Sequence, residues 1–144
     1  MKKIVFLSIL VLGLIFINMG TLKAQQLYLY GGQNNDVFLG CLTCNKFNTE
    51  SIWYKHGTYG SKHSSNSIWN KHGTYGSKHN MYSPWNQYSN NAPVVVDKDG
   101  NFYGYFSSNK YIPKRVTDRW LIEILDNWEW IMDNFDDYVG KLKL

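Results

Sequence analysis

The sequence lacks several features that would assign it to a familiar functional class. Charged residues make up only 18% of its 144 residues and proline occurs only 3 times, whereas aromatic residues reach 17%. A charge-driven disordered chain is excluded, because such chains contain few aromatic residues. The chain is long enough for one compact domain with its own core. No G-x-S-x-G, H-E-x-x-H or phosphate-cradling glycine loop occurs, so no common catalytic motif indicates an enzyme.

The first 24 residues have the layout of a secretory signal peptide. Lys2 and Lys3 precede a continuous apolar run over residues 4–17, and a more polar stretch ends at Ala24. The apolar run is short for a bilayer-spanning helix, and no second segment of the sequence is long and apolar enough to span a membrane. We therefore expect export to the periplasm, the cell surface or the medium. The alternative is that this segment is not cleaved and anchors the protein, as its only contact with a membrane.

The basic character of the chain comes largely from this segment. Its three lysines account for most of the formal net charge of +4, so residues 25–144 carry about +1. The isoelectric point near 9.0 is therefore no indication of nucleic-acid binding. Lysine and histidine dominate residues 45–92, whereas residues 117–144 are acidic. We expect these two parts to face each other or to be solvated, rather than to form a charged ligand site.

A repeat of 16 residues organises the middle of the chain. The segment 51–63 recurs almost unchanged as 67–79 and a decayed third copy follows, which makes Trp53, Trp69 and Trp85 equivalent. Extending the repeat backward gives three units, at residues 45–60, 61–76 and 77–92. Each unit is too short to bury its own apolar side, so we expect successive units to stack their aromatic residues.

Each unit is predicted to contain one helical turn followed by a short extended link. Ser51 or Ser67 would cap the turn, and Gly57 or Gly73 would take the left-handed conformation at its end. A single helical turn is marginal in water, so burial of the aromatic side chains would decide the fold.

A second duplication brackets the three units. The segment 37–47 aligns with 101–111 at an offset of 64 residues, which is four repeat lengths. An extended apolar stretch and a turn with Gly-Gly or Asp-Gly precede each copy, a pattern typical of β-hairpins. We therefore expect one hairpin at 27–44 and a related hairpin at 94–111.

The C-terminal part has the periodicity of an amphipathic helix, predicted at 117–135 with Thr117 as its cap and Asp118 at its positive start. The apolar positions are Trp120, Leu121, Ile124, Leu125, Trp128 and Ile131. We expect the hairpin sheet to cover this face, with a protein-binding helix as the alternative. The predicted fold is α+β: two β-hairpins bracketing three aromatic turn repeats, then the helix, in a single domain over 25–144.

The repeats resemble those of a group of small exported bacterial proteins. These proteins repeat Tyr-Gly-Ser-x-Tyr-Ser-x-x-Ser-Ile-x-Asn-x-Tyr-Gly units beside a strand that reads Gly-Asn-(Phe/Tyr)-(Leu/Tyr)-Gly, and residues 35–111 carry the similarity. Histidines 56, 63, 72 and 79 stand where those proteins often have tyrosine, which suggests aromatic packing positions. The resemblance implies export and the repeat architecture, and it supplies no catalytic residue.

Cys41 and Cys44 leave three states open: a disulfide, free thiols or a zinc site. An exported protein permits a disulfide, but residues three apart in a strand are separated by about 10 Å, so the chain would have to turn after Cys41. With His56 and His63 the cysteines give Cys-x2-Cys-x11-His-x6-His, a near miss to zinc-finger spacing. The repeat explains every histidine without a metal, so we expect no cofactor, with zinc as the alternative.

The sequence favours a non-enzymatic binding or structural module of the cell envelope. Aromatic residues beside amide groups suit sugars or peptides, so a glycan or an envelope protein is the expected partner. The candidate ligand-binding residues are Trp53, Trp69, Trp85, Tyr59 and Tyr75. At least two of the three tryptophans are nonetheless expected in the core. The alternative function is a metal-binding protein that uses the two cysteines and the repeat histidines.

Overall fold

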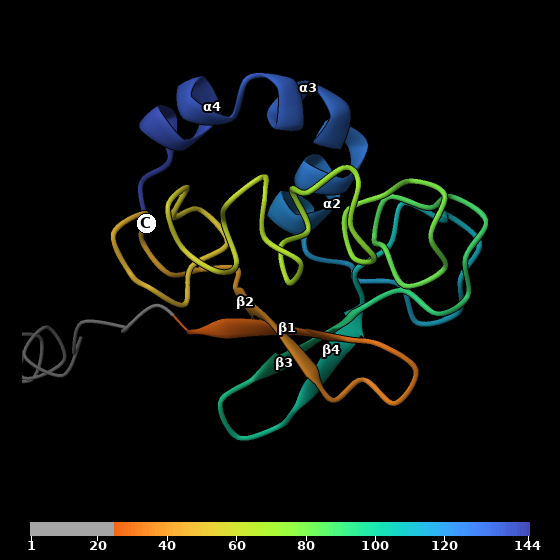
Figure 1. The fold of residues 1–144 in the computed structure, drawn as a ribbon. Coiled ribbons are helices and arrows are strands. Elements are labelled where there is room, and N and C mark those ends of the chain that lie inside the picture. Colours follow the sequence, from red (N-terminus) through yellow and green to blue (C-terminus); the bar gives the residue numbers. More distant parts are fainter. Residues whose placement is uncertain (1–24) are drawn as a thin grey trace, which may run out of the picture.

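Four strands form one antiparallel sheet in the computed structural model, which describes residues 25–144 (Figure 1). The strands are β1 (Leu27–Gly31), β2 (Val37–Cys41), β3 (Val94–Asp97) and β4 (Phe102–Tyr105), in the order β2-β1-β3-β4. The signal peptide predicted at 1–24 lies outside the described residues. The predicted α+β fold is confirmed, and the two hairpins share a single sheet.

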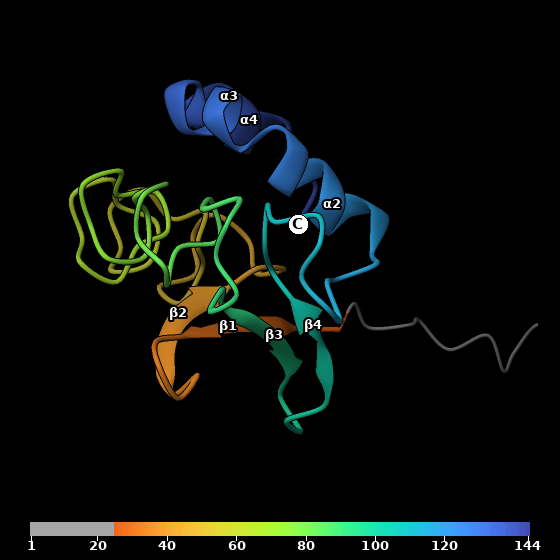
Figure 2. The same cartoon turned by 90° about the vertical axis from the view of Figure 1, so that its right-hand side faces the viewer.

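The repeats lie on one side of this sheet, and three short helices arch over the repeats (Figures 1 and 2). The helices are α2 (Arg119–Asp126), α3 (Trp128–Asp133) and α4 (Phe135–Lys141). No helix between residues 25 and 144 has both the length and the apolar character to cross a membrane. The molecule therefore has three layers, with the repeats in the middle.

A pseudo-two-fold axis through the centre of the sheet relates the two hairpins. Leu29 of β1 pairs with Val95 of β3 at the centre. The pair Tyr28–Val96 on one side corresponds to the pair Val94–Tyr30 on the other. The strand register shifts after Leu29 in the first hairpin and after Val95 in the second. The duplication seen in the sequence is therefore also a structural duplication.

Equivalent glycines mark the same bend in both hairpins. Gly40 in β2 has φ +111° and Gly104 in β4 has φ +126°, a region that favours glycine. After each bend the chain folds back past the glycine. An added Cβ would lie 3.0 Å from the Glu50 carbonyl oxygen at Gly40 and 2.8 Å from the Lys114 carbonyl oxygen at Gly104. The last residue of each strand also forms a parallel β-bridge with this later segment: Cys41 pairs with Ser51, and Tyr105 pairs with Arg115. The glycines therefore permit a close approach that the fold uses twice.

The repeats are a continuous series of β-turns, so the predicted helical turns are wrong. Backbone hydrogen bonds span three residues, as from the Asn70 amide to the Ser67 carbonyl and from the Gly73 amide to the Asn70 carbonyl. Ser67 Oγ also accepts from the Trp69 amide at 3.1 Å, and Asn70 Oδ1 accepts from the His72 amide at 3.2 Å. Such local bonds compete with helix formation. Most turns begin with serine or asparagine, and these residues therefore favour a series of separate turns over a helix.

The glycines of the repeats have a steric role. Gly57 and Gly73 do not take the predicted left-handed conformation, because within residues 25–144 the glycines with positive φ all belong to the hairpins. Gly60 and Gly76 are the sterically required positions. A Cβ at either one would lie 2.1 Å from a backbone carbonyl oxygen of the same unit. No side chain fits where the turns fold back on themselves.

The three equivalent tryptophans form a buried column. Trp53, Trp69 and Trp85 are only 1–2% exposed, and neighbouring rings lie 5.4 and 5.3 Å apart. Trp69 Nε1 donates to the Ile52 carbonyl at 2.8 Å, and Trp85 Nε1 donates to the Ile68 carbonyl at 2.6 Å. Each indole therefore binds its unit to the preceding one, as the predicted stacking of units requires.

Three helices replace the single helix predicted at 117–135. Asp118 caps α2 in place of Thr117, since its carboxylate accepts from two backbone amides of the first turn. The breaks fall at Asn127 and Asn134, whose side-chain amides donate to the carbonyl four residues earlier at 2.9 Å. These bonds compete with the regular helical pattern. The chain changes direction at each asparagine.

The breaks let the helices follow the tryptophan column. The helices pack on this column and not on the sheet. Trp128 stacks on Trp85 with ring centroids 5.3 Å apart, and Phe135 meets Trp69 edge-on at 5.5 Å. Tyr138 lies 5.5 Å from Trp53. Thus α3 covers the third unit of the repeat and α4 covers the second and the first. Within residues 25–144 no helix lies against a strand, so the predicted contact between the helix face and the sheet is wrong.

We expect Trp69→Phe to destabilise the protein by about 1–3 kcal/mol, because the buried Ile52 carbonyl would lose its donor. Trp69→Ala should cost about 3–5 kcal/mol, since it also removes the ring. Urea unfolding followed by circular dichroism measures both. Trp130 is 50% exposed, so Trp130→Phe should stay within about 0.5 kcal/mol of the parent. Equal stability of Trp69→Phe and the parent would contradict the ladder of indole hydrogen bonds.

We expect Gly76→Ala to destabilise the protein by more than about 1 kcal/mol, because its Cβ would overlap a backbone carbonyl. Gly140→Ala is the matched control. Gly140 lies in α4 with nothing within 4 Å of an added Cβ, so alanine there should stabilise the protein by about 0.5–1 kcal/mol. Thermal unfolding of both variants distinguishes the two effects, and a neutral Gly76→Ala would refute the steric role.

Candidate functional site

The face of the sheet that points away from the repeats is left uncovered by the other described elements (Figure 2). Successive side chains of a strand point to opposite faces, so Leu29 is buried in the core while Tyr28 and Tyr30 are only half-buried. Phe38 of β2 lies 5.3 Å from Tyr30 and 4.8 Å from Tyr59 of the first repeat unit. A cluster of rings therefore lies on the open face.

This face contains a hollow of about 680 Å³, which we call the sheet-face hollow. Its apolar lining comes from Tyr28, Tyr30, Phe38, Val94 and Val96. Its polar lining comes from Asn35, Glu50, Asp97 and Lys98. An apolar, aromatic floor with a few polar groups at its margin is the usual composition of a small-ligand site. The rings offer flat faces and the rim offers both donors and acceptors.

Asp97 anchors the β3–β4 turn beside the hollow. Its Oδ1 accepts from the backbone amides of Asp99 and Asn101, both at 2.9 Å. Its Oδ2 accepts from the Asn101 side-chain amide at 2.8 Å, and from the Tyr103 hydroxyl and the Gln25 amide at 3.1 Å each. The carboxylate is therefore saturated by its own surroundings, and its role is to hold the turn.

These hydrogen bonds lower the pKa of Asp97 below its ordinary value of 3.8, with the Asn101 side-chain amide as the largest cause. Burial opposes the shift, and the Asn101 backbone, Tyr103 and Asp99 donors add to it. Burial and the hydrogen bond to Asp97 raise the pKa of the Tyr103 hydroxyl. Asp97 therefore stays ionised and Tyr103 stays protonated across the neutral range.

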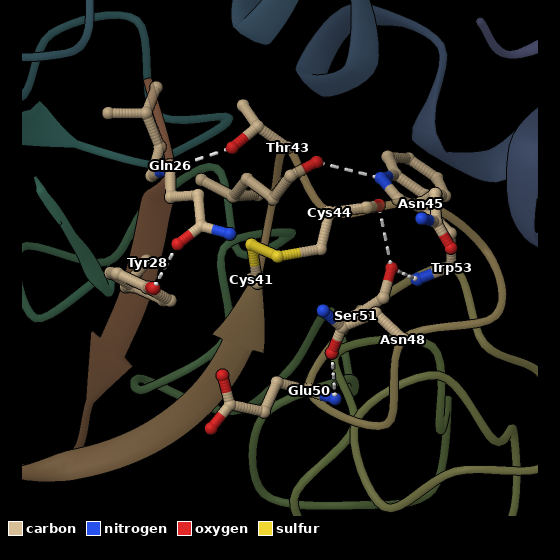
Figure 3. The surroundings of a disulfide bond; sticks show 12 residues. Gln26, Tyr28, Cys41, Thr43, Cys44, Asn45, Asn48, Glu50, Ser51 and Trp53 are labelled. Carbon is tan, nitrogen blue, oxygen red and sulfur yellow. Dashed lines mark hydrogen bonds between the residues drawn. A yellow bond between two sulfur atoms is a disulfide. The ribbon is translucent and has the colours of Figure 1, made fainter. Parts of the chain in front are cut away.

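Cys41 and Cys44 form a disulfide, which selects one of the three states left open by the sequence (Figure 3). The chain turns after Cys41, so the two Cα atoms lie 5.5 Å apart. Beside the bond, Ser51 Oγ donates to the Cys44 carbonyl at 3.0 Å. Trp53 Nε1 donates to the Leu42 carbonyl at 2.8 Å. The disulfide thus fixes the passage from β2 into the first repeat unit.

The zinc site considered as the alternative, with Cys41, Cys44, His56 and His63, is not formed. Both sulfur atoms are bonded to each other, whereas zinc binding needs free thiolates. His56 and His63 lie exposed on the repeats. Across the part of the chain that the structure describes, no group of three or more histidine, cysteine, aspartate or glutamate side chains is arranged to hold a metal ion.

The candidate ligand-binding residues taken from the repeats lie mostly in the core. Trp53, Trp69 and Trp85 are covered on their faces by one another and by the helices, so they offer no exposed stacking surface. Their selection as ligand contacts is therefore wrong, while the expectation that at least two lie in the core is confirmed.

The two repeat tyrosines pack against the first hairpin. Tyr59 contacts Phe38 at the margin of the sheet-face hollow. Tyr75 lies against the β1–β2 turn, where an added Cβ on Gly31 would meet its ring at 3.5 Å. Burial, followed by the negative charge of Asp36, raises the pKa of the Tyr75 hydroxyl. Of the five repeat aromatics, Tyr59 lies nearest to the aromatic cluster of the open face.

Tyr28, Tyr30 and Phe38 were not among the candidate site residues predicted from the sequence. The alternation Leu27-Tyr28-Leu29-Tyr30 was a usable signal, because two leucines on one face of a strand place two tyrosines on the other. No family model, curated protein or solved structure matches the chain. The geometry of the sheet-face hollow is therefore the basis on which a function can be argued.

We expect Asp97→Asn to reduce stability at neutral pH, because an amide cannot accept hydrogen bonds on both of its terminal atoms. Because the pKa of Asp97 is lowered in the folded state, its ionised carboxylate stabilises the fold. This stabilisation is complete above the ordinary pKa of 3.8 and is lost as the pH falls through the folded-state pKa. The stability difference between parent and variant should therefore shrink in acid. Urea titrations at pH values on both sides of 3.8 measure it, with exposed Asp99→Asn as the control. A difference independent of pH would contradict this role.

Proposed function

We propose that the protein is an exported, non-enzymatic binding module of the cell envelope that holds a sugar residue of a glycan in the sheet-face hollow. The observation that carries the proposal is the group of Tyr28, Tyr30 and Phe38 around a hollow of about 680 Å³ on an uncovered sheet face. Monomeric proteins seldom leave aromatic clusters of this kind in water without a binding partner.

The chemistry of the hollow fits a sugar. A pyranose ring has an apolar face of C–H groups that packs on aromatic rings, and its hydroxyl groups both donate and accept hydrogen bonds. Lys98 supplies donors at the rim, Glu50 supplies acceptors, and the Asn35 amide supplies both. A planar hydrophobic ligand would use the floor and leave these rim groups without partners.

Two features support export. The Cys41–Cys44 disulfide is the kind of bond that persists in oxidising compartments. The N-terminal sequence has a basic start followed by an apolar run, as secretory signals have. A glycan of the envelope is then a ligand that the protein would meet.

We expect Tyr30→Ala to weaken binding of a soluble cell-wall oligosaccharide about tenfold or more, because it removes one stacking surface from the floor. Isothermal titration calorimetry against a panel of such oligosaccharides measures the change. Tyr111 is 93% exposed and outside the hollow, so Tyr111→Ala should bind like the parent. Unchanged affinity in both Tyr28→Ala and Tyr30→Ala, or the absence of binding across the panel, would overturn the proposal.

A further inference from the structure

A second concave surface runs between the repeats and the C-terminal helices. Three neighbouring hollows of about 540, 420 and 870 Å³ lie along this boundary. Met132 and Asp133 line both the first and the second, and Trp128 and Glu129 line both the second and the third. The hollows therefore form one groove between the repeats and the helices, which we call the helix–repeat groove.

One wall of this groove repeats with the sequence. Lys-His pairs from two turns line the first hollow, at positions 55–56 and 62–63. The equivalent pairs at 71–72 and 78–79 line the second hollow. All eight of these side chains belong to exposed residues. The repeat thus presents the same basic group to the groove at successive levels.

The opposite wall is acidic and the floor is aromatic. The helices contribute Glu129, Asp133, Asp136 and Asp137 to the first two hollows. The floor contains the partly buried Phe135 in the first hollow and Trp128 in the second. A ligand in the groove would therefore meet ammonium donors on one side, carboxylate acceptors on the other and aromatic surface below.

Few contacts between the walls close the groove. Lys55 lies 3.0 Å from Asp136, and Lys78 lies 3.8 Å from Glu129, with all four side chains more than half exposed. Exposed ion pairs of this kind contribute little to stability. Among residues 25–144, no hydrogen bond or ion pair engages the side chains of Lys62 and Lys71. These donors are available to a ligand.

The spacing of the units indicates the class of ligand. The ring centroids of neighbouring indoles lie 5.4 and 5.3 Å apart, so the units stack at about this spacing. An extended glycan advances by a similar distance with each ring. The same-face side chains of an extended peptide recur only every second residue, at about 6.6 Å. Sugar hydroxyls can also donate to the acidic wall while they accept from the basic wall.

We propose that the helix–repeat groove binds an extended, uncharged segment of a glycan chain, with one sugar ring for each repeat unit. This site lies on the other side of the repeats from the sheet-face hollow and does not depend on it. A polyanion would be repelled by the acidic wall and a polycation by the lysines, so an uncharged chain that carries hydroxyl groups satisfies both walls.

The test is a titration of the purified protein with neutral linear oligosaccharides of increasing length, cello- and chito-oligosaccharides, followed by tryptophan fluorescence. We expect the emission to shift, because Trp128 lies at the floor, and the affinity to rise with chain length until the groove is filled. Lys62→Ala should weaken binding about tenfold, since it removes a charged hydrogen-bond donor. Lys46→Ala is the matched control, because Lys46 is exposed at the equivalent repeat position and lies outside the groove.

The proposal would be overturned by affinity that does not depend on chain length, by equal losses in Lys62→Ala and Lys46→Ala, or by tighter binding of polyglutamate or polylysine than of the neutral chains. Absence of binding by all the neutral chains would also overturn it. Urea unfolding confirms that each variant remains folded. Tyr30→Ala should leave this titration unchanged, so failure of the sheet-face site and failure of the groove give different results.

Discussion

The structure depends on a hydrogen bond between a buried indole N–H and a backbone carbonyl of the preceding repeat unit. The turns of each unit satisfy their own backbone groups locally, so the repeats contain no helix or sheet ladder that would hold one unit to the next. The bonds from Trp69 to Ile52 and from Trp85 to Ile68 supply that connection. A buried donor and a buried acceptor are both costly when unpaired, so each bond sets the register of its unit.

Both candidate sites follow from this column. Trp128 of α3 and Phe135 and Tyr138 of α4 cover the three indoles, and the space left beside these contacts is the helix–repeat groove. On the other side of the repeats, Tyr59 and Tyr75 pack against the first hairpin. The sheet therefore has one face covered by the repeats and one face left open. The protein presents two surfaces of different shape, a compact hollow and a long groove, on opposite sides of one layer of turns.

The sequence predicted long-range features better than local conformation. The hairpins at 27–44 and 94–111 and the equivalence of the three tryptophans follow from apolar patterning and duplication, which survive in any local geometry. The helical turns, the left-handed Gly57 and Gly73 and the single helix at 117–135 were wrong, because serine and asparagine side chains bond to nearby backbone groups. Ser67 and Asn70 do so in the repeats and Asn127 does so between helices. The recurrence of serine or asparagine at three-residue intervals within a unit, as at positions 61, 64, 67 and 70, was the missed signal.

Sequence by itself determined the periodicity of this protein: which residues are equivalent, how many units there are and where the two hairpins lie. These follow from covalent order and from the alternation of apolar and polar side chains. Tertiary structure alone decided which equivalent residues are buried and which surfaces stay open. Indoles that looked available as ligand contacts entered the core, and Tyr28 and Tyr30 remained outside it. The physical reason is that burial depends on which elements pack against each other, and the packing of helices on repeats is not encoded in either segment alone.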